Sequence, residues 1–527
     1  MSTRPNFLVL VTDDQGPWAM SRTCPELVTP VLDDLVSRST SFDNFYCASP
    51  VCSPARASLL TGRMPSAHGV HDWLVGERHP DALEDVYLGG LVTLPEVLDQ
   101  AGYTCAMSGK WHVGTSRHPA PGFDRWYAHR LGGGPYYGAP VWTSQGEPAS
   151  EERYFTYAVA EEACRFIDEI AARATPRYPG RLEAGSSRPG PDGPAPGAGR
   201  PEPGESPSAA STASPGQDGV GRDADGSAPF YLQVNFTAPH TPWIDNHPQD
   251  LYDLYRDCDF PSVPREERHP WSEPRRDFDD AFADPVRHLQ GYAASLSGVD
   301  RALGMLLERL RLHGLDDNTV IVYMADNGFS CGHHGIWGKG NGTYPLNFWQ
   351  NSVTVPCVVH RPGQSRAHRV DEHVSACGFL ETICELAGVR APEDPLRAAG
   401  SFAGLLDGDR PAEDRPVVVF DEYGGGRMIR QGDHKYVERH DGPTELYDLA
   451  EDPQERHNLA ENAEKASLAS DLRTCLRDWF AAHENPVDSA WTRGVRGIGQ
   501  VHPPRKGYDD ERTYIQLPIS LDGSPRP

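Results

Sequence analysis

Two adjacent aspartates, Asp13 and Asp14, follow an apolar run near the start of the chain, and a second apolar run leads into Asp326 and Asn327. Such runs are typical of buried parallel strands, and ligands of open α/β sheets gather at the carboxyl ends of strands. Adjacent carboxylates repel each other unless a cation or a helix N-terminus neutralises them, and their hard oxygens suit Ca²⁺ or Mg²⁺. The sequence therefore predicts that the two strand ends converge on one divalent cation. An Asx turn is the alternative interpretation of Asp13 and Asp14.

Cys52 begins the run CSPARASLLTGR, residues 52–63. A Cys-x-Pro-x-Arg pattern alone also fits a buried, inert thiol in a proline-containing turn before a helix. With Leu-Thr-Gly-Arg following at this spacing, however, the run resembles the signature of the type I sulfatases of the alkaline phosphatase superfamily. The resemblance implies that a formylglycine-generating maturation enzyme oxidises Cys52 to Cα-formylglycine, whose hydrate is the nucleophile held by Arg56. Ala55 stands where the family usually has serine, a change that the family tolerates.

Three further motifs resemble segments of the same family. Lys110 and His112 lie in a Gly-Lys-Trp-His motif after an apolar run, His240 lies in a Pro-His motif after another, and Lys339 ends the sequence Gly-Ile-Trp-Gly-Lys. A sulfate ester is an anion, so its pocket needs fixed cations, and lysine is a compact charge suited to a tetrahedral group. A surface lysine and a turn histidine are the alternatives for Lys110 and His112. His333 and His334 match no motif and are interpreted as loop residues.

The resemblance implies a ligand set for the metal. One divalent cation, Ca²⁺ with Mg²⁺ as the alternative, would be held together with an oxygen of the formylglycine hydrate at position 52 by Asp13, Asp14, Asp326 and Asn327. The cation would lower the pKa of the hydrate hydroxyl, so that a nucleophile exists near neutral pH.

The resemblance also assigns roles to the basic side chains. Lys110 and Lys339 would stabilise charge on the sulfate oxygens during in-line displacement at sulfur. His240 would protonate the leaving alkoxide or phenoxide. His112 would deprotonate the second hydroxyl of the sulfated hydrate, and sulfate would leave by C–O cleavage. An unmodified Cys52 lacks that second hydroxyl, so the predicted activity depends on its oxidation.

The elements that must position these residues alternate between strands and helices. Apolar runs at 6–11, 103–108, 230–236 and 319–324 predict strands, and residues 154–172 predict a helix with one broad apolar face. This alternation predicts an α/β fold with a large mixed or parallel central sheet flanked by helices. The resemblance implies that the fold is alkaline-phosphatase-like, with a smaller C-terminal α+β subdomain that carries a short antiparallel sheet.

The composition suggests how the 527 residues divide. A catalytic domain is predicted over 1–414, interrupted at 174–227 by a disordered insertion rich in Pro, Gly and Ser. Short strands and a helix predict the C-terminal subdomain over 415–485. Residues 486–527 form an extension that matches no known pattern and is expected to cover either the rim of the active site or an oligomer interface.

Charge and cysteine usage limit the partners and the compartment. With 49 basic and 75 acidic residues, the formal charge of −26 argues against a nucleic-acid partner. No apolar stretch has membrane-spanning length, and the polar start of the chain contains no secretory signal. The eleven cysteines are scattered and odd in number, which favours free buried thiols and a cytoplasmic enzyme.

The resemblance leaves the substrate open. A small-molecule or saccharide sulfate ester is expected, and the stretch from Phe236 to Pro242, which resembles carbohydrate sulfatases, favours a saccharide. A formylglycine-dependent phosphonate monoester or phosphodiester hydrolase is the nearer alternative, since it shares the nucleophile and the metal site. A non-catalytic binding protein with a sulfatase fold is the more distant one.

Overall fold

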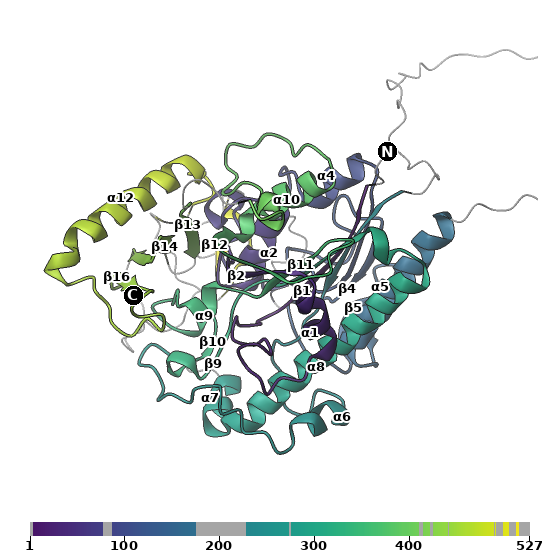
Figure 1. Cartoon of the computed structure of the whole chain (residues 1–527), viewed down its shortest axis with the longest axis horizontal. Helices are drawn as coiled ribbons and strands as arrows, with labels where there is room; N and C mark the ends of the chain where they lie inside the picture. Colours follow the sequence, from purple (N-terminus) through teal and green to yellow (C-terminus); the bar gives the residue numbers. More distant parts are fainter. Residues whose placement is uncertain are drawn as a thin grey trace, which may run out of the picture.

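The computed structural model describes residues 4–76, 79, 87–174, 228–272, 276–409, 415–421, 425–440, 442–489, 491, 499–504 and 513–515. Residues 175–227 of the predicted insertion lie outside this set. The described residues form a layered α/β body with a smaller sheet and a long helix at one end (Figure 1).

The central element is a mixed sheet, which has eight strands among the described residues. In spatial order they are β12 (His368–Ser375), β2 (Thr40–Tyr46), β11 (Cys357–His360), β8 (Thr319–Ala325), β1 (Asn6–Thr12), β7 (Phe230–Asn235), β3 (Thr104–Gly109) and β4 (Arg125–Ala128). Strand β11 runs antiparallel to both of its neighbours, whereas the other pairings are parallel. The predicted large mixed or parallel sheet is therefore confirmed.

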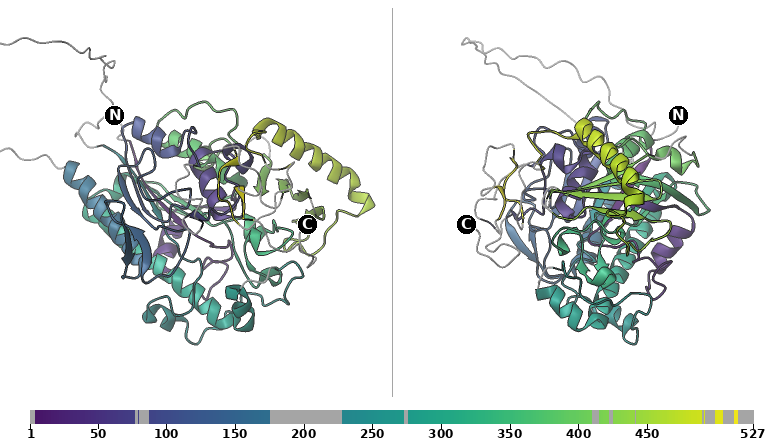
Figure 2. Two further views of the ribbon diagram at one scale, coloured as in Figure 1. Left: turned by 180° about the vertical axis from the view of Figure 1, so that it is seen from behind. Right: turned by 90° about the vertical axis from the view of Figure 1, so that its left-hand side faces the viewer.

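Strand β1 lies inside the sheet and is buried on both faces, which explains its uninterrupted apolar sequence. Leu8 and Leu10 face one helical layer, formed by α1 (Pro30–Ser37), α5 (Phe155–Ala174) and α8 (Pro285–Leu312). Phe7, Val9 and Val11 face the opposite layer, formed by α2 (Cys52–Thr61), α4 (Leu94–Gln100) and α10 (Phe379–Leu386). The views in Figures 1 and 2 show these layers on either side of the sheet.

A second, antiparallel sheet follows in the C-terminal part and has four strands among the described residues. Its order is β13 (Val417–Asp421), β14 (Gly426–Gln431), β15 (His434–Arg439) and β16 (Glu445–Asp448). Helix α12 (Ala466–His483) packs on it through Leu472, Leu476 and Phe480. This is the predicted short antiparallel sheet with its helix, while the domain boundaries at 414 and 485 stay a prediction.

Shorter elements connect these layers. The helices are α3 (Pro65–His68), α6 (Gln249–Tyr252), α7 (Arg276–Ala283), α9 (Gln350–Val353) and α11 (Ala403–Leu406). Two small antiparallel pairs join β5 (Ala139–Trp142) to β6 (Pro148–Glu151) and β9 (Ser330–Cys331) to β10 (Trp337–Gly338). The 3₁₀ turns are η3 (Asp253–Tyr255), η4 (Asp316–Asn318), η5 (His333–Gly335), η6 (Gly340–Gly342), η7 (Ala376–Gly378) and η8 (Ala463–Lys465).

Candidate active site

The predicted acidic residues lie at the carboxyl ends of the adjacent parallel strands β1 and β8. Asp13 and Asp14 follow β1, and Asp326 follows β8. The backbone N–H of Asp326 donates to the carbonyl of Thr12 at 3.0 Å, and the N–H of Asp14 donates to Asp326 Oδ1 at 3.4 Å. One carboxylate oxygen from each of the three aspartates lies within 4.8 Å of the others. Strand pairing thus brings together side chains that are more than 300 residues apart in sequence.

Asn327 and Lys339 join this acidic group. The side-chain Nδ2 of Asn327 donates to Asp14 Oδ1 at 2.8 Å, and Lys339 Nζ donates to the same oxygen at 2.5 Å. The ammonium of Lys339 also lies 3.1 Å from Cys52 Sγ. A single buried lysine therefore contacts both the predicted nucleophile position and a predicted metal ligand.

Helix α2 positions Cys52 and Arg56. Cys52 is its first residue, and all ten residues of the helix are buried. Because residues four apart lie on the same face of a helix, Arg56 is placed one turn below Cys52. Its Nε donates to Asp326 Oδ2 at 2.8 Å, and one terminal nitrogen donates to the backbone carbonyl of Lys110 at 3.0 Å. Arg56 thereby links the helix to the ends of two strands.

Lys110 follows strand β3 at a close approach of two backbones. The preceding Gly109 has φ +110°, and a Cβ there would lie 2.0 Å from the carbonyl oxygen of Asn235 at the end of β7, so only glycine fits. The N–H of Lys110 donates to the same carbonyl at 2.8 Å. Its ammonium, fully buried, pairs with Asp13 Oδ2.

His240 and His112 lie beside one glycine-rich segment. His240 Nε2 is 3.8 Å from Asp14 Oδ2, and its Nδ1 donates to the carbonyl of Thr241 at 2.6 Å. A Cβ on Gly132 would lie 2.1 Å from His112 Nε2, and one on Gly133 would lie 3.1 Å from His240 Cε1. The two rings are therefore covered by consecutive residues that have no side chain.

Electrostatics within the cluster follow from burial and from the lysines. Burial opposes ionisation of Asp13 and Asp14, but the surrounding positive charges together outweigh it, so the pKa of each carboxyl is lowered. Lys110 is the strongest of these charges for Asp13 and Lys339 for Asp14. Burial and the Asp13 charge raise the pKa of Asp326 in spite of Arg56.

The Cys52 thiol has the opposite behaviour. Burial raises its pKa even though Lys110 and Lys339 both favour the thiolate. An unmodified Cys52 is therefore a neutral thiol at neutral pH, and the thiolate is the reactive form of cysteine.

Several atoms of the cluster show that it is arranged for more than its own packing. Among the described residues, Asp13 Oδ1 and Arg56 Nη2 are buried without a hydrogen-bond partner. Asp14 and His112 adopt φ values of 65° and 57°, a left-handed region that non-glycine residues seldom occupy and that clusters at functional sites. The donor set of carboxylate and amide oxygens with an unsatisfied buried oxygen fits a hard divalent cation.

Two histidines that match no motif lie away from the cluster, while one backbone group that contacts it has no sequence pattern. His333 and His334 lie outside the cluster, since their rings pack on Trp18 at 5.0 Å and on Trp349 at 4.4 Å between centroids. In contrast, no sequence pattern points to the carbonyl of Leu74, to which His112 Nε2 donates at 3.0 Å. A backbone carbonyl is present in every residue, so no side-chain pattern could reveal it.

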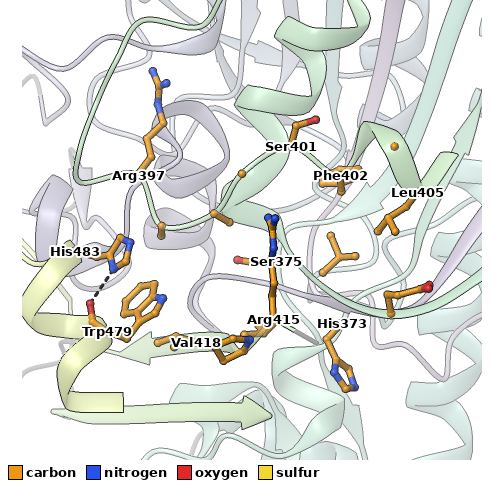
Figure 3. Close-up of a pocket in the computed structure, with 18 of the residues that line it drawn as sticks. His373, Ser375, Arg397, Ser401, Phe402, Leu405, Arg415, Val418, Trp479 and His483 are labelled. Atoms are coloured by element: carbon orange, nitrogen blue, oxygen red, sulfur yellow. Dashed lines mark hydrogen bonds between the residues drawn. The ribbon is translucent and has the colours of Figure 1, made fainter. Parts of the chain in front are cut away.

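The described residues also enclose a cavity of about 680 Å³ away from this cluster (Figure 3). Its lining includes Ser375 at the end of β12, Val418 of β13, and Trp479 and His483 of α12. None of the predicted site residues is among those that line it. It lies near the C-terminal end of α2, since Ala398, another lining residue, donates its N–H to the carbonyl of Gly62 at 2.8 Å. Cys52 begins the same helix at its other end.

Comparison with known proteins agrees with the arrangement. The sequence profile of the sulfatase family matches residues 5–389, and that of the N-sulphoglucosamine sulphohydrolase C-terminal region matches residues 341–481. A choline-sulfatase of Rhizobium meliloti is 28% identical, over 91% of this chain and 87% of that protein.

Two solved structures share the fold. One is a complex of a protein with its substrate D-glucosamine-2-N,6-O-disulfate, with a TM-score of 0.67, 22% identity, and coverage of 91% of this chain and 98% of that one. The other is the phosphonate monoester hydrolase of Agrobacterium radiobacter, with a TM-score of 0.64, 20% identity, and coverage of 91% and 96%.

The chain belongs to the sulfatase family, whose profile covers most of it. It is accordingly a sulfuric ester hydrolase with the alkaline-phosphatase-like fold, and both the resemblance carried by the Cys52 segment and the predicted fold class are confirmed.

Proposed function

We propose that this sulfatase cleaves its ester with a formylglycine hydrate made from Cys52, beside one divalent cation held by Asp13, Asp14, Asp326 and Asn327. The observation that carries the proposal is the position of Lys339, whose ammonium is 3.1 Å from Cys52 Sγ and 2.5 Å from Asp14 Oδ1. A nucleophile, a cation-binding acid and a fixed positive charge thus meet within one buried contact. An inert structural cysteine needs neither of the other two groups.

Two groups would supply part of the chemistry, and the side chains of the site would supply the rest. Formylglycine hydrate offers an oxygen nucleophile with a second hydroxyl on the same carbon, and a bound cation, Ca²⁺ with Mg²⁺ as the alternative, polarises oxygens beside it. Asp13 Oδ1, buried and unpartnered among the described residues, supports a cation at this place. The net reaction consumes water and yields an alcohol or phenol and sulfate.

The basic side chains would bind the ester and move its protons. Lys110 and Lys339, both buried, would bind the sulfate oxygens, because fixed ammonium groups in a site of low dielectric stabilise charge that develops there. His240 would donate a proton from Nε2 to the leaving oxygen, because its Nδ1 is already committed to the carbonyl of Thr241. His112 would act as the base that completes sulfate release, and Arg56 would orient the nucleophile.

Mass spectrometry and activity together test this proposal. We expect protein coexpressed with a formylglycine-generating maturation enzyme to lose about 18 Da at Cys52 and to release sulfate from an aryl sulfate. Cys52→Ala should remove the activity, by on the order of 10⁶-fold. The matched control is Cys357→Ala, which replaces another buried cysteine in β11 and should keep the activity. Absence of conversion at Cys52 in an active enzyme would contradict the proposal.

A phosphonate monoester or phosphodiester hydrolase is the second candidate, because the Agrobacterium enzyme of that name shares the fold. The two activities are separated by kcat/KM on an aryl sulfate, a phenyl phosphonate ester and a phosphodiester with the same leaving group. We propose that the sulfate is preferred. A ratio in favour of either phosphorus ester would reverse the assignment.

We infer that the natural substrate is a sulfated saccharide, with a small sulfated metabolite as the alternative. The glucosamine disulfate bound by one structural neighbour supports the first, and the choline-sulfatase relative supports the second. Sulfate release from glucosamine 6-sulfate and from choline sulfate, at equal concentrations, decides between them.

We also infer a reducing compartment, the cytoplasm. All eleven cysteines lie in the described residues and are free, nine of them buried, which suits a compartment where thiols stay reduced. No helix among the described residues has the length and apolar character needed to cross a membrane. Fractionation of cells of the source organism, with an antibody to this chain, tests the location.

A further inference from the structure

The C-terminal extension returns to the catalytic body. We call residues 499–504 and 513–515 the C-terminal strap. Its two segments pair with each other, since Val501 N–H donates to the carbonyl of Thr513 at 2.8 Å and Ile515 N–H to that of Gly499 at 3.0 Å. The strap is drawn in yellow beside the purple and blue N-terminal elements in both views of Figure 2. The extension was predicted to cover either the active-site rim or an oligomer interface, and the strap residues lie against the loop 69–76.

Gln500 makes the central contacts of the strap with this loop, and its side chain is fully buried. Its Oε1 accepts from the N–H of His71 at 2.7 Å, and its Nε2 donates to the carbonyl of Gly69 at 2.8 Å. Its backbone continues the pairing, because its N–H donates to Trp73 at 2.9 Å and its carbonyl accepts from Val75 at 3.1 Å. One residue of the strap therefore hydrogen-bonds to the loop at Gly69 and His71 and again on either side of Leu74, at Trp73 and Val75.

Tyr514 holds the same loop from the second segment. Its hydroxyl is hydrogen-bonded to His71 Nδ1, and the two rings are stacked with centroids 6.0 Å apart. The side chain is buried. The strap thus binds the backbone of the loop through Gln500 and the His71 side chain through Tyr514.

Leu74, whose neighbours Trp73 and Val75 both bond to Gln500, lies between the strap and the candidate active site. Its N–H donates to Ser53 Oγ at 3.1 Å, and Ser53 lies next to Cys52 in sequence. Its carbonyl accepts from His112 Nε2 at 3.0 Å. Because a carbonyl can only accept, Nε2 carries the proton in the neutral ring, and Nδ1 is then the nitrogen able to take up a proton.

We propose that Gln500 and Tyr514 are positioning residues for His112. By holding the loop 69–76 they fix the carbonyl of Leu74, and this carbonyl selects the His112 tautomer with a basic Nδ1 and sets the direction of the ring. Partners of this kind control which nitrogen of a functional histidine is available. The proposal rests on the proposed function, in which His112 acts as the base.

A double-mutant cycle tests the proposal in the full-length, formylglycine-containing enzyme. We expect Gln500→Ala to lower kcat for an aryl sulfate about tenfold with little change in KM, because a misdirected base slows a chemical step without weakening substrate binding. In a His112→Ala background the same substitution should change kcat by less than about twofold, because the positioned group is gone. A purely structural role predicts equal factors in both backgrounds, and that result would overturn the proposal.

Two controls separate positioning from general damage. Gln350→Ala removes another glutamine whose side chain bonds within the protein, to Tyr46 Oη at 3.0 Å, and should leave kcat unchanged. Tyr514→Phe deletes one hydroxyl and serves as the second variant if Gln500→Ala does not fold. Its matched control is Tyr255→Phe, which deletes a buried hydroxyl bonded to Ser297 at 2.6 Å. Tyr514→Phe with unchanged kcat, in an enzyme that needs His112, would contradict the proposal.

Failure of the proposed function is distinguishable from failure of this inference. A wild-type enzyme that releases no sulfate from any ester tested, after full conversion of Cys52, refutes the function alone. The ring nitrogens of His112, assigned by comparison with His112→Gln in ¹⁵N-histidine-labelled protein, then decide about the strap. A loss of the Nε2–H tautomer in Gln500→Ala supports the inference, and an unchanged spectrum overturns it.

Discussion

Lys339 and Lys435 are both buried and both pair with a carboxylate, yet their surroundings differ. Lys339 bonds to Asp14 beside Cys52, whereas Lys435 of β15 bonds to Glu455 in the C-terminal part, and both members of that second pair are 1% exposed. Around Lys435 the polar groups are satisfied, because its ammonium also donates to the carbonyl of Phe348 and to a glutamine side chain. Burial and pairing alone therefore do not mark a functional lysine.

The charge balance separates the two sites further. At Lys339, burial opposes the charge, but Asp14, Cys52 and the other two aspartates together outweigh it and raise the pKa of the ammonium well above its ordinary value. At Lys435, burial together with the charge of Arg430 outweighs Glu455 and Glu445, and the pKa of the ammonium is lowered. Three aspartates and three cationic side chains form one cluster around Lys339, whereas Lys435 pairs with Glu455. Among the described residues, Asp13 Oδ1 in that cluster is buried without a hydrogen-bond partner, which supports the proposed cation site there.

The largest effect should come from Lys339→Met. We expect kcat/KM for an aryl sulfate to fall on the order of 10³-fold, because a fixed charge near the reacting group is lost. The melting temperature should change less than in the corresponding variant of Lys435, because Asp14 keeps its hydrogen bond from Asn327. Steady-state kinetics and thermal unfolding measure both quantities. Full activity of Lys339→Met would contradict a functional role for Lys339.

Lys435→Met should have the converse effect. Removal of one partner leaves Glu455 as an uncompensated buried charge, so the free energy of unfolding should fall by about 3 to 5 kcal/mol. The activity per folded molecule should be unchanged. The double variant Lys435→Met, Glu455→Gln should recover most of the stability, since no buried charge then remains. Urea unfolding tests this, and a double variant no more stable than the single one would show that the charge is not the cause.

Removal of divalent cations should lower stability as well as activity. A ligand present at about 100 times its dissociation constant stabilises the folded state by about 2.7 kcal/mol, so chelation should lower the melting temperature, and added Ca²⁺ or Mg²⁺ should restore it. The ion that restores it at the lower concentration is the preferred one. Lys435→Met should keep this cation-dependent shift and Asp326→Asn should lose it. A shift that survives in Asp326→Asn would place the cation elsewhere.

The fold and most residues of the candidate site could be proposed from the sequence because both depend on local patterns. Buried strands such as β1 and β8 are uninterrupted apolar runs, and the residues that follow them meet wherever parallel strands are adjacent, which brings Asp13 to Asp326. The sequence does not encode strand order in any local pattern, so the antiparallel β11 between β2 and β8 was not predicted.

The contacts of the strap were beyond prediction for a related reason. His71 and Gln500 are 429 residues apart, and the bond joins a backbone N–H to a glutamine side chain, neither of which carries a distinctive signal. The carbonyl of Leu74 carries no distinctive signal either, because every residue has a backbone carbonyl. Chemistry-bearing side chains can be recognised in a sequence, whereas the backbone groups that orient them are visible only once the chain is folded.

A third buried carboxylate, Asp300 of α8, sharpens the comparison because its partners are backbone N–H groups instead of a lysine. Its Oδ1 accepts from Leu32 N–H at 2.7 Å, yet burial raises its pKa from 3.8 to about 6. The unfolded chain ionises this group at lower pH than the folded one, so the folded state binds more protons between these values, and stability falls as pH rises from about 4 through 6.

Asp300→Asn keeps an acceptor oxygen for Leu32 without the charge. Its free energy of unfolding should therefore equal that of the wild type near pH 4 and exceed it by about 1 kcal/mol at pH 8. Urea unfolding at the two pH values measures the difference. A gain that is independent of pH would mean that ionisation of the Asp300 carboxylate is not what lowers the stability of the folded state.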